Sequence, residues 1–454
     1  MSFFRVKMGS FLTLGTLAHF RHLQLVLFMP AILKLLICFV LVLGISRTRL
    51  PLSLSLLIGA VVLGFWAGQS PSGLGVIAFD SLTSWSTFYL VAIIALILFL
   101  SRLMEQSGHL QRIVYAFILV VKDRRVVAAL VPALIGLLPM PGGALFSAPL
   151  VKKTVEDIPI PAERKAMINY WFRHVWEYWW PLYPGFILAA GLLAIPTWQL
   201  MAVQFPLAIF CVISGVIFLI LPLKELKNRE GPANRWESFR MLLKEAAPII
   251  MVVVVIIVLN LVRRIMESAG VEIAYPPELS VLVGIVICIG MVIRTNRRGW
   301  EDLIRALKDR KYLDFIFLIL AIMIFKGVLN GSSIIMEIKD ELLDYRIPLL
   351  LIITVLPFIS GVVTGIAVGF VGASFPVIIP MLDGLPPISY LAYAALAYSC
   401  GYMGMMLSPV HLCLLVSKDY FKAGLPSCYS LLIKLVVLVL ILTGIYIFIL
   451  TRLG

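Results

Sequence analysis

The sequence predicts an all-α polytopic membrane protein made of two inverted repeats, each with five transmembrane helices and one re-entrant hairpin. Three observations lead to this prediction: repeated apolar runs, two apolar segments broken by proline and glycine, and loop charges that alternate along the chain. Of the 454 residues, 61% are hydrophobic and 14% are charged, whereas soluble domains carry about 25% charged residues. Apolar runs of about 20 residues identify membrane helices.

The apolar runs form two series with a polar stretch between them. The first series predicts helices near residues 30–47, 50–69, 86–104, 164–193 and 198–222. The second predicts helices near 246–263, 277–293, 313–330, 387–416 and 427–451. We expect amphipathic surface helices near 105–123 and 297–312, where charges mix with spaced apolar residues.

These runs divide the chain into a first repeat at 30–222, a cytoplasmic linker at 223–244 and a second repeat at 245–454. Residues 1–29 are either an N-terminal extension or an extra helix. The count is therefore ten helices, or eleven if residues 9–29 also cross the membrane.

The first broken segment, residues 132–149, contains four prolines and three glycines and no charge. Proline removes a backbone donor, and the freed backbone groups cannot face lipid. The segment therefore predicts a re-entrant hairpin at 126–151 that is buried in protein or lines a cavity. A proline-kinked structural helix is the alternative.

The second broken segment predicts another hairpin at 347–381, with glycines at 361, 365 and 369. This four-residue spacing is by itself a common helix-packing motif. However, Pro132 and Gly136 recur as Pro357 and Gly361, both 225 residues later. The recurrence indicates an internal duplication, and two opposed hairpins would present helix ends and free backbone groups near the membrane midplane.

The loop charges indicate the topology. Basic residues flank the first hairpin, whereas acidic residues flank the second. By the positive-inside rule, the first hairpin enters from the cytoplasm and the second from outside, and the C-terminus lies outside. The net charge of +14 lies mainly in short loops, which fits topology signals better than a nucleic-acid surface.

The hairpin tips and the helices that follow them supply the candidate substrate contacts. Helix 164–193 is interrupted at Pro181 and helix 387–416 at Pro409, and such discontinuous helices in corresponding positions indicate a transporter site. The candidate substrate-binding residues are Pro141, Gly142, Gly143, Ser147, Thr364, Gly365, Ser408 and Pro409.

Arg173, His174 and Glu177 form the one ionisable cluster within a predicted span. Charges in a membrane are costly and usually functional or paired. Arg173 is a candidate to offset substrate charge, and His174 with Glu177, three residues apart, a candidate hydrogen-bonded pair or proton relay. The alternative is an interfacial position where Arg173 snorkels among aromatic residues. His411, two residues after Pro409, is a further candidate.

The cysteines give no metal or redox signal. All six fall in or beside apolar runs without CxxC spacing, so we interpret them as small core residues. The spacing of His174 and Glu177 superficially resembles a metal-ligand pair, but no third ligand has supporting spacing. We therefore expect no metal and no cofactor.

Three motifs carry a family resemblance: Leu138–Ala144, the Trp180-Pro181 break and Ser360–Gly372. Through them the sequence resembles the ion-transporter superfamily of secondary carriers over residues 30–450. Within it, the sequence is most similar to an uncharacterised prokaryotic integral membrane family related to gluconate permeases and to TRAP-transporter large membrane subunits. The resemblance implies a scaffold domain, a transport domain with two hairpins, a homodimer and elevator-like alternating access. Neither hairpin has the Ser-Asn-Thr tip of Na⁺-dicarboxylate relatives, which argues against that sodium site and that substrate.

The function predicted from these features is secondary active transport of a small organic anion across the cytoplasmic membrane, coupled to H⁺ or Na⁺. Its partners would be the bilayer, the anion and the coupling ion, with no nucleic acid. An ion channel with re-entrant loops is one alternative, and a membrane subunit of a binding-protein-dependent carrier is another. A membrane-embedded enzyme is a third class, which we do not expect because neither HExxH nor GxSxG occurs.

Overall fold

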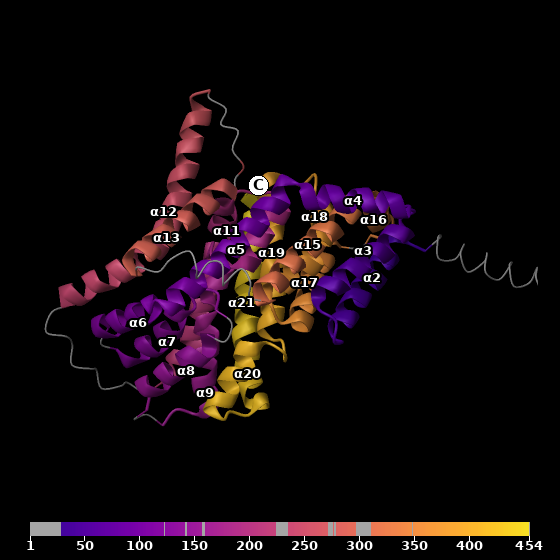
Figure 1. The fold of residues 1–454 in the computed structure, drawn as a ribbon. Helices are drawn as coiled ribbons and strands as arrows, with labels where there is room; N and C mark the ends of the chain where they lie inside the picture. Colours follow the sequence, from indigo (N-terminus) through magenta and orange to yellow (C-terminus); the bar gives the residue numbers. More distant parts are fainter. Residues whose placement is uncertain are drawn as a thin grey trace, which may run out of the picture.

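The computed structural model describes residues 29–121, 123–140, 143–156, 159–223, 235–270, 276, 278–296, 310–346 and 348–453. Within these ranges every regular element is a helix, which confirms the all-α prediction (Figure 1). Residues 1–28 of the predicted N-terminal extension, half of the linker at 223–244 and most of the surface helix at 297–312 lie outside the described residues.

The elements of the first half follow the predicted order, with additional divisions. They are α2 (Ala31–Ser46), α3 (Leu52–Trp66), α4 (Pro71–Thr83), α5 (Trp85–Gln106), α6 (His109–Val120), α7 (Arg124–Ile135), α8 (Gly143–Thr154), α9 (Ala162–Arg173), the 3₁₀-helix η1 (Val175–Tyr178), α10 (Pro184–Leu193), α11 (Thr197–Gly215) and the π-helical turn η2 (Val216–Ile220).

The second half repeats much of this order. Its elements are α12 (Arg235–Ser268), α13 (Glu278–Asn296), α15 (Arg310–Asn330), α16 (Ile334–Asp344), α17 (Leu349–Thr364), α18 (Ala367–Leu382), α19 (Pro387–Met406), α20 (Leu412–Phe421) and α21 (Leu425–Leu453).

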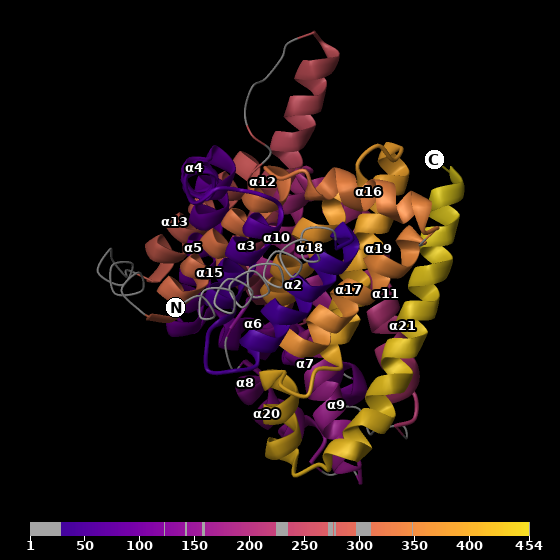
Figure 2. The ribbon, with the colours of Figure 1, turned by 90° about the vertical axis from the view of Figure 1, so that its right-hand side faces the viewer.

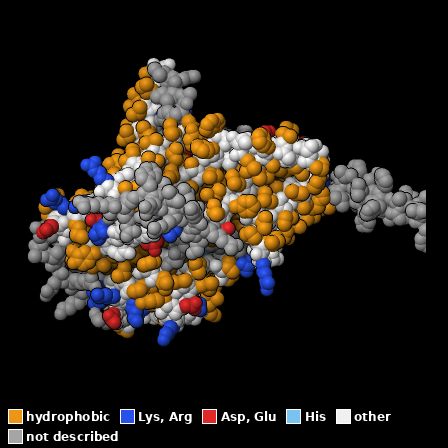
Figure 3. Space-filling view, in the orientation of Figure 1, with side chains coloured by type: hydrophobic (Ala, Val, Ile, Leu, Met, Phe, Trp, Pro, Cys, Tyr) orange, Lys and Arg blue, Asp and Glu red, His pale blue; other side chains and the backbone are white. Residues whose placement is uncertain are grey.

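The helices have the length and surface of a membrane protein. Among the described residues, six helices are long and apolar enough to cross a bilayer, and shorter apolar helices include α10, α17 and α18. Large apolar side chains such as Val40, Trp85 and Phe448 are more than half exposed, and hydrophobic atoms cover much of the visible face (Figure 3). Such a surface suits lipid, whereas soluble monomers rarely expose large apolar patches.

Three elements differ from the sequence prediction. Helix α4 occupies residues expected to be a loop, because Pro71 is at its first position and the Ser70 hydroxyl accepts the Gly73 N–H. Helix α16 was likewise not predicted. Helix α12 begins at Arg235, inside the expected linker, so the end of that stretch is helical.

Both broken segments are helical hairpins. In the first, α7 ends at Ile135 and α8 begins at Gly143; in the second, α17 ends at Thr364 and α18 begins at Ala367. Gly365 ends α17 with a φ of +67°, a left-handed conformation that glycine adopts without a Cβ penalty. Each following helix is also interrupted, since η1 and a turn separate α9 from α10, and residues 407–411 separate α19 from α20.

The hairpins pack on these interrupted helices. Helix α7 contacts α9 and α8 contacts α20, while α17 contacts α19 and α18 contacts α10. In Figure 2, α7, α8, α9 and α20 lie together in the lower part of the molecule, with α17 and α18 above them. The break after α9 and the break before α20 therefore meet between the hairpins.

Candidate functional site

The residues at the two breaks bring together side chains distant in sequence. His174 Nε2 lies 3.1 Å from His411 Nε2 and 3.8 Å from Glu177 Oε1. His174 Nδ1 lies 2.7 Å from the carbonyl oxygen of Tyr170. Both histidines are buried. The fold thus joins His411 to the cluster at residues 173–177.

Arg173 extends from the end of α9 into the interior and does not snorkel, since its relative exposure is 4%. Its Nη2 donates to the carbonyl oxygen of Met140 at 2.9 Å. Its Nε and Nη1 have no hydrogen-bond partner among the described residues. A Cβ added at Gly143 would overlap the guanidinium, so this cation lies directly against the start of α8.

Asn169, one turn earlier on α9, connects three helices. Its Nδ2 donates to the Ala144 carbonyl at 3.0 Å and to Ser417 Oγ at 2.9 Å. The side chain is fully buried and its Oδ1 has no partner in the described part of the chain. The sequence analysis did not identify Asn169, because a lone asparagine in a helix gives no spacing signal.

Tyrosine hydroxyls donate to backbone carbonyls at the two breaks. Tyr398 donates to the Glu177 carbonyl at 2.8 Å, Tyr170 to the Met406 carbonyl at 2.9 Å, and Tyr402 to the His174 carbonyl. Free carbonyls inside a membrane protein need such donors. These hydrogen bonds stabilise the backbone of each break and do not use the side chains of the capped residues.

The hydroxyls expected to contact substrate donate to the protein itself. Thr364 Oγ1 donates to the Ser360 carbonyl and Ser408 Oγ to the Val362 carbonyl, both at 2.7 Å. Ser147 Oγ lies 3.3 Å from two carbonyls of its own helix. These three hydroxyl groups therefore stabilise the hairpins. Because their protons are already donated, they could contact a substrate only as hydrogen-bond acceptors.

The remaining predicted contacts divide between the two hairpins. Pro141 and Gly142 lie outside the described residues. Gly365 faces Ser408, because a Cβ there would lie 2.9 Å from Ser408 Oγ. Pro409 is exposed, one residue beyond the buried Ser408. The second hairpin and the second break thus touch each other, whereas Arg173 is beside the first hairpin.

Cys413 joins the cluster and was not predicted as a site residue. The six cysteines are free, and five are buried like core residues, but Cys413 is partly exposed. Its Sγ and one nitrogen each of His174 and His411 lie within 4.8 Å of one another. The His411-Leu412-Cys413 spacing directly after a helix break was the available signal.

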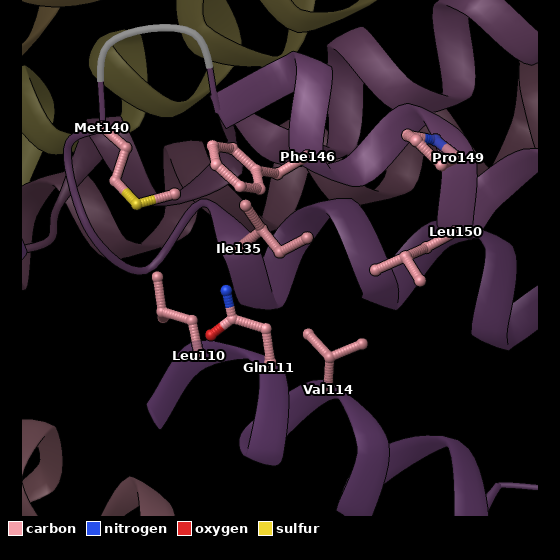
Figure 4. A pocket seen from close by; sticks show the side chains of 8 residues that line it. All are labelled: Leu110, Gln111, Val114, Ile135, Met140, Phe146, Pro149 and Leu150. Atoms are coloured by element: carbon pink, nitrogen blue, oxygen red, sulfur yellow. The ribbon is translucent and has the colours of Figure 1, made fainter. Parts of the chain in front are cut away.

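An apolar cavity of about 210 Å³ lies beside the first hairpin, between α6, α7 and α8 (Figure 4). Its lining is apolar except for Gln111 and comprises Leu110, Gln111, Val114, Ile135, Met140, Phe146, Pro149 and Leu150. This lining suits hydrocarbon and offers an anion few donors. Met140 thus lines this cavity and also offers its carbonyl to Arg173, which is not among the lining residues.

Comparison with known proteins places the chain in one family. A search of the curated proteins gave no match. A family model described as a protein of unknown function, DUF401, matches residues 30–450, which covers both hairpins, both breaks and all the helices of the site. The chain belongs to the DUF401 family.

Proposed function

We propose that this protein is a secondary active transporter that moves a small organic anion across the cytoplasmic membrane by alternating access. One observation carries the proposal: the buried Arg173 guanidinium has two donor nitrogens without partners among the described residues. Burying a cation whose donors are only partly paired is costly, even with the Cys413 and Glu177 side chains near it. A bound anion would remove that cost.

The neighbourhood of Arg173 favours a carboxylate. The guanidinium is planar and pairs with carboxylates through two parallel hydrogen bonds. Gly143, against which it lies, begins the twelve-residue helix α8, and a helix N-terminus attracts negative charge.

The order of the elements supports two related repeats. The starts of α5 and α15, α6 and α16, α7 and α17, and α9 and α19 are each 225 residues apart. The hairpin contacts recur as well: α7 with α9 corresponds to α17 with α19, and α8 with α20 corresponds to α18 with α10. An inverted arrangement of the repeats, with the C-terminus outside, agrees with the loop charges.

Glycines at equivalent places make the same backbone contact. A Cβ at Gly136 would overlap the Arg173 carbonyl oxygen, and a Cβ at Gly361 would overlap the Gly401 carbonyl oxygen. Paired hairpins on discontinuous helices are the architecture in which secondary carriers bind substrate. The resemblance to gluconate permeases and TRAP membrane subunits agrees with this proposal.

Uptake by purified protein in proteoliposomes tests the proposal. Labelled mono-, di- and tricarboxylic acids and sugar acids would be offered under an imposed H⁺ or Na⁺ gradient, one gradient at a time. We expect gradient-driven accumulation of at least one acid, and its loss in Arg173→Gln. Arg263→Gln is the matched control, because Arg263 pairs at 2.7 Å with Glu267 on the outer part of α12. Failure of every acid to accumulate under both gradients would overturn the proposal.

A further inference from the structure

The cluster behind Arg173 has the composition of a metal site. His174 Nε2, His411 Nε2 and Cys413 Sγ lie within 4.8 Å of one another. In a tetrahedral zinc site, bonds of about 2.0–2.3 Å place ligand atoms roughly 3.3–3.7 Å apart. The two nitrogens are already 3.1 Å apart, so small side-chain movements would complete this geometry.

The hydrogen bonding of His174 leaves its Nε2 free to accept, either from His411 or from a metal ion. Because a carbonyl oxygen accepts and cannot donate, His174 Nδ1 must carry the proton in its bond to Tyr170. In the neutral ring, Nε2 therefore carries no proton, and its lone pair is available to His411. A metal-ligating histidine characteristically donates its other N–H to a backbone carbonyl in this way.

His411 leaves a polar atom that the protein does not pair. Its Nδ1 is buried and has no hydrogen-bond partner in the described ranges, and the side chain is 6% exposed. Its Nε2 contacts His174 Nε2, and the ring also interacts with the Cys413 side chain. A metal ion bound to the two Nε2 atoms would use both lone pairs, and the buried His411 Nδ1–H would still need an acceptor such as a water molecule.

Glu177 lies beside the three-residue group and would become the fourth ligand if its side chain moved toward it. Its Oε1 is 3.8 Å from His174 Nε2, and the side chain is 14% exposed. Two neutral imidazoles, one thiolate and one carboxylate balance the charge of a divalent ion. Such a site is neutral overall and would leave Arg173 as the positive group that faces the hairpin.

We propose that His174, His411, Cys413 and Glu177 bind one divalent transition-metal ion of the zinc type. Mixed imidazole and thiolate ligands select such ions over Mg²⁺ or Ca²⁺. His174 and Glu177 flank the break after α9, whereas His411 and Cys413 flank the start of α20. The ion therefore connects the two interrupted helices and stabilises their contact, a role beyond the proposed transport.

Cobalt titration of the full-length protein in detergent tests this site, because tetrahedral Co²⁺ bound to thiolate gives a distinct charge-transfer absorption. After treatment with a chelator, the protein should bind one equivalent of Co²⁺ with this absorption, and Zn²⁺ should displace it. Cys413→Ser should lose the thiolate absorption, and His411→Gln should weaken binding at least about 100-fold. Cys38→Ser is the matched control, since Cys38 is a buried cysteine of α2 that contacts the Gly59 carbonyl.

The Co²⁺ titration of the wild-type protein tests the proposal even if a variant does not fold. Absence of Co²⁺ binding, or binding without a thiolate band, would overturn the metal site and favour His174 and Glu177 as a proton relay. X-ray absorption of the Zn²⁺ form should show a mixed sulfur and nitrogen or oxygen shell; a shell without sulfur would count equally against it. Anion uptake by the chelator-treated protein is a separate result, so either proposal can fail alone.

Discussion

The two interrupted helices share a backbone design and differ in chemistry. With Pro181 aligned on Pro409, 228 residues later, Tyr170 corresponds to Tyr398. Each of these tyrosines donates to a carbonyl at the break of the other helix. At the same register, the positions of Arg173, His174 and Glu177 are occupied by Gly401, Tyr402 and Met405. The first break therefore holds the charges, and the second supplies close packing and capping donors.

This difference has a physical reason. Gly404 lets α17 approach α19 closely, since a Cβ there would overlap the Phe358 carbonyl, and a Cβ at Gly401 would overlap the ring of Phe370 on α18. A charged side chain would not fit there. At the first break, Gly143 instead provides the space that the Arg173 guanidinium fills. Glycine thus allows backbone contact in one half and a buried cation in the other.

The largest effect on folding should come from the glycines that the halves share. Gly136→Ala and Gly361→Ala each force a methyl group into a backbone carbonyl, which cannot move as a side-chain end can. We expect each to lower the free energy of unfolding by about 1–3 kcal/mol or more, measured by thermal melting in detergent. Gly44→Ala is the control, because nothing lies within 4 Å of its added Cβ. If only one of the two substitutions lowered the free energy of unfolding, the two glycines would not have equivalent roles in their hairpins.

The second effect should be on transport and confined to the first break. In Gly143→Ala the new methyl group meets the end of the flexible Arg173 side chain, so the guanidinium moves and the fold is kept. Loss of a charged hydrogen bond costs about 1.5–3 kcal/mol. We expect anion uptake to fall roughly 10- to 100-fold while the melting temperature changes little. If Gly143→Ala took up the anion as fast as wild type does, the role given to Arg173 would be contradicted.

The reciprocal tyrosines should have smaller and equal effects. Tyr170→Phe leaves the buried Met406 carbonyl without its donor, and Tyr398→Phe does the same for Glu177. Each unsatisfied carbonyl should cost about 1–3 kcal/mol in unfolding free energy. The exposed Tyr115 gives the control variant Tyr115→Phe. Clearly unequal penalties would show that the two breaks are not equivalent in their backbone support.

The sequence predicted the fold better than the site. Apolar runs located most of the long helices within a few residues, although α12 begins eleven residues before its predicted run at 246–263. Proline with glycine marked both hairpins and both breaks, because these residues act locally on the backbone. The 225-residue recurrence of Pro132 and Gly136 also matches the spacing of helix starts. Helix α4 was missed because its Ser70 cap and Pro71 also read as a loop.

Site residues were predictable only where they cluster along the chain. Arg173, His174 and Glu177 lie within one short stretch and were identified together. Cys413 and Asn169 gain meaning from tertiary contacts, Cys413 with His174 and Asn169 with Ser417. No spacing rule in a single sequence brings α9 against α20. The hydroxyls of Thr364 and Ser408 were predicted to contact substrate, whereas in the structure each donates a hydrogen bond to a carbonyl of the second hairpin.

The smallest effect should be a pH dependence present in one hairpin alone. Asp123 caps α7 by accepting the Arg125 N–H at 2.8 Å, whereas α17 begins after Pro348 without a side-chain cap. The side-chain hydrogen bond from Arg125 lowers the pKa of Asp123 below its usual value. Its stabilisation is therefore full above the unfolded pKa of about 3.9 and is lost as pH falls through the folded pKa.

Asp123→Ala should accordingly cost about 1 kcal/mol of unfolding free energy at pH 7, and the difference from wild type should shrink toward zero as the pH is lowered through 4 to 3. Melting temperatures of the two proteins in detergent across this range give the measurement. Asp419→Ala, at an exposed carboxylate paired with its neighbour Lys418, controls for removal of a surface charge. A penalty for Asp123→Ala that stays constant from pH 7 to 3 would show that the carboxylate charge does not stabilise the mouth of the first hairpin, and the two hairpins would then begin alike.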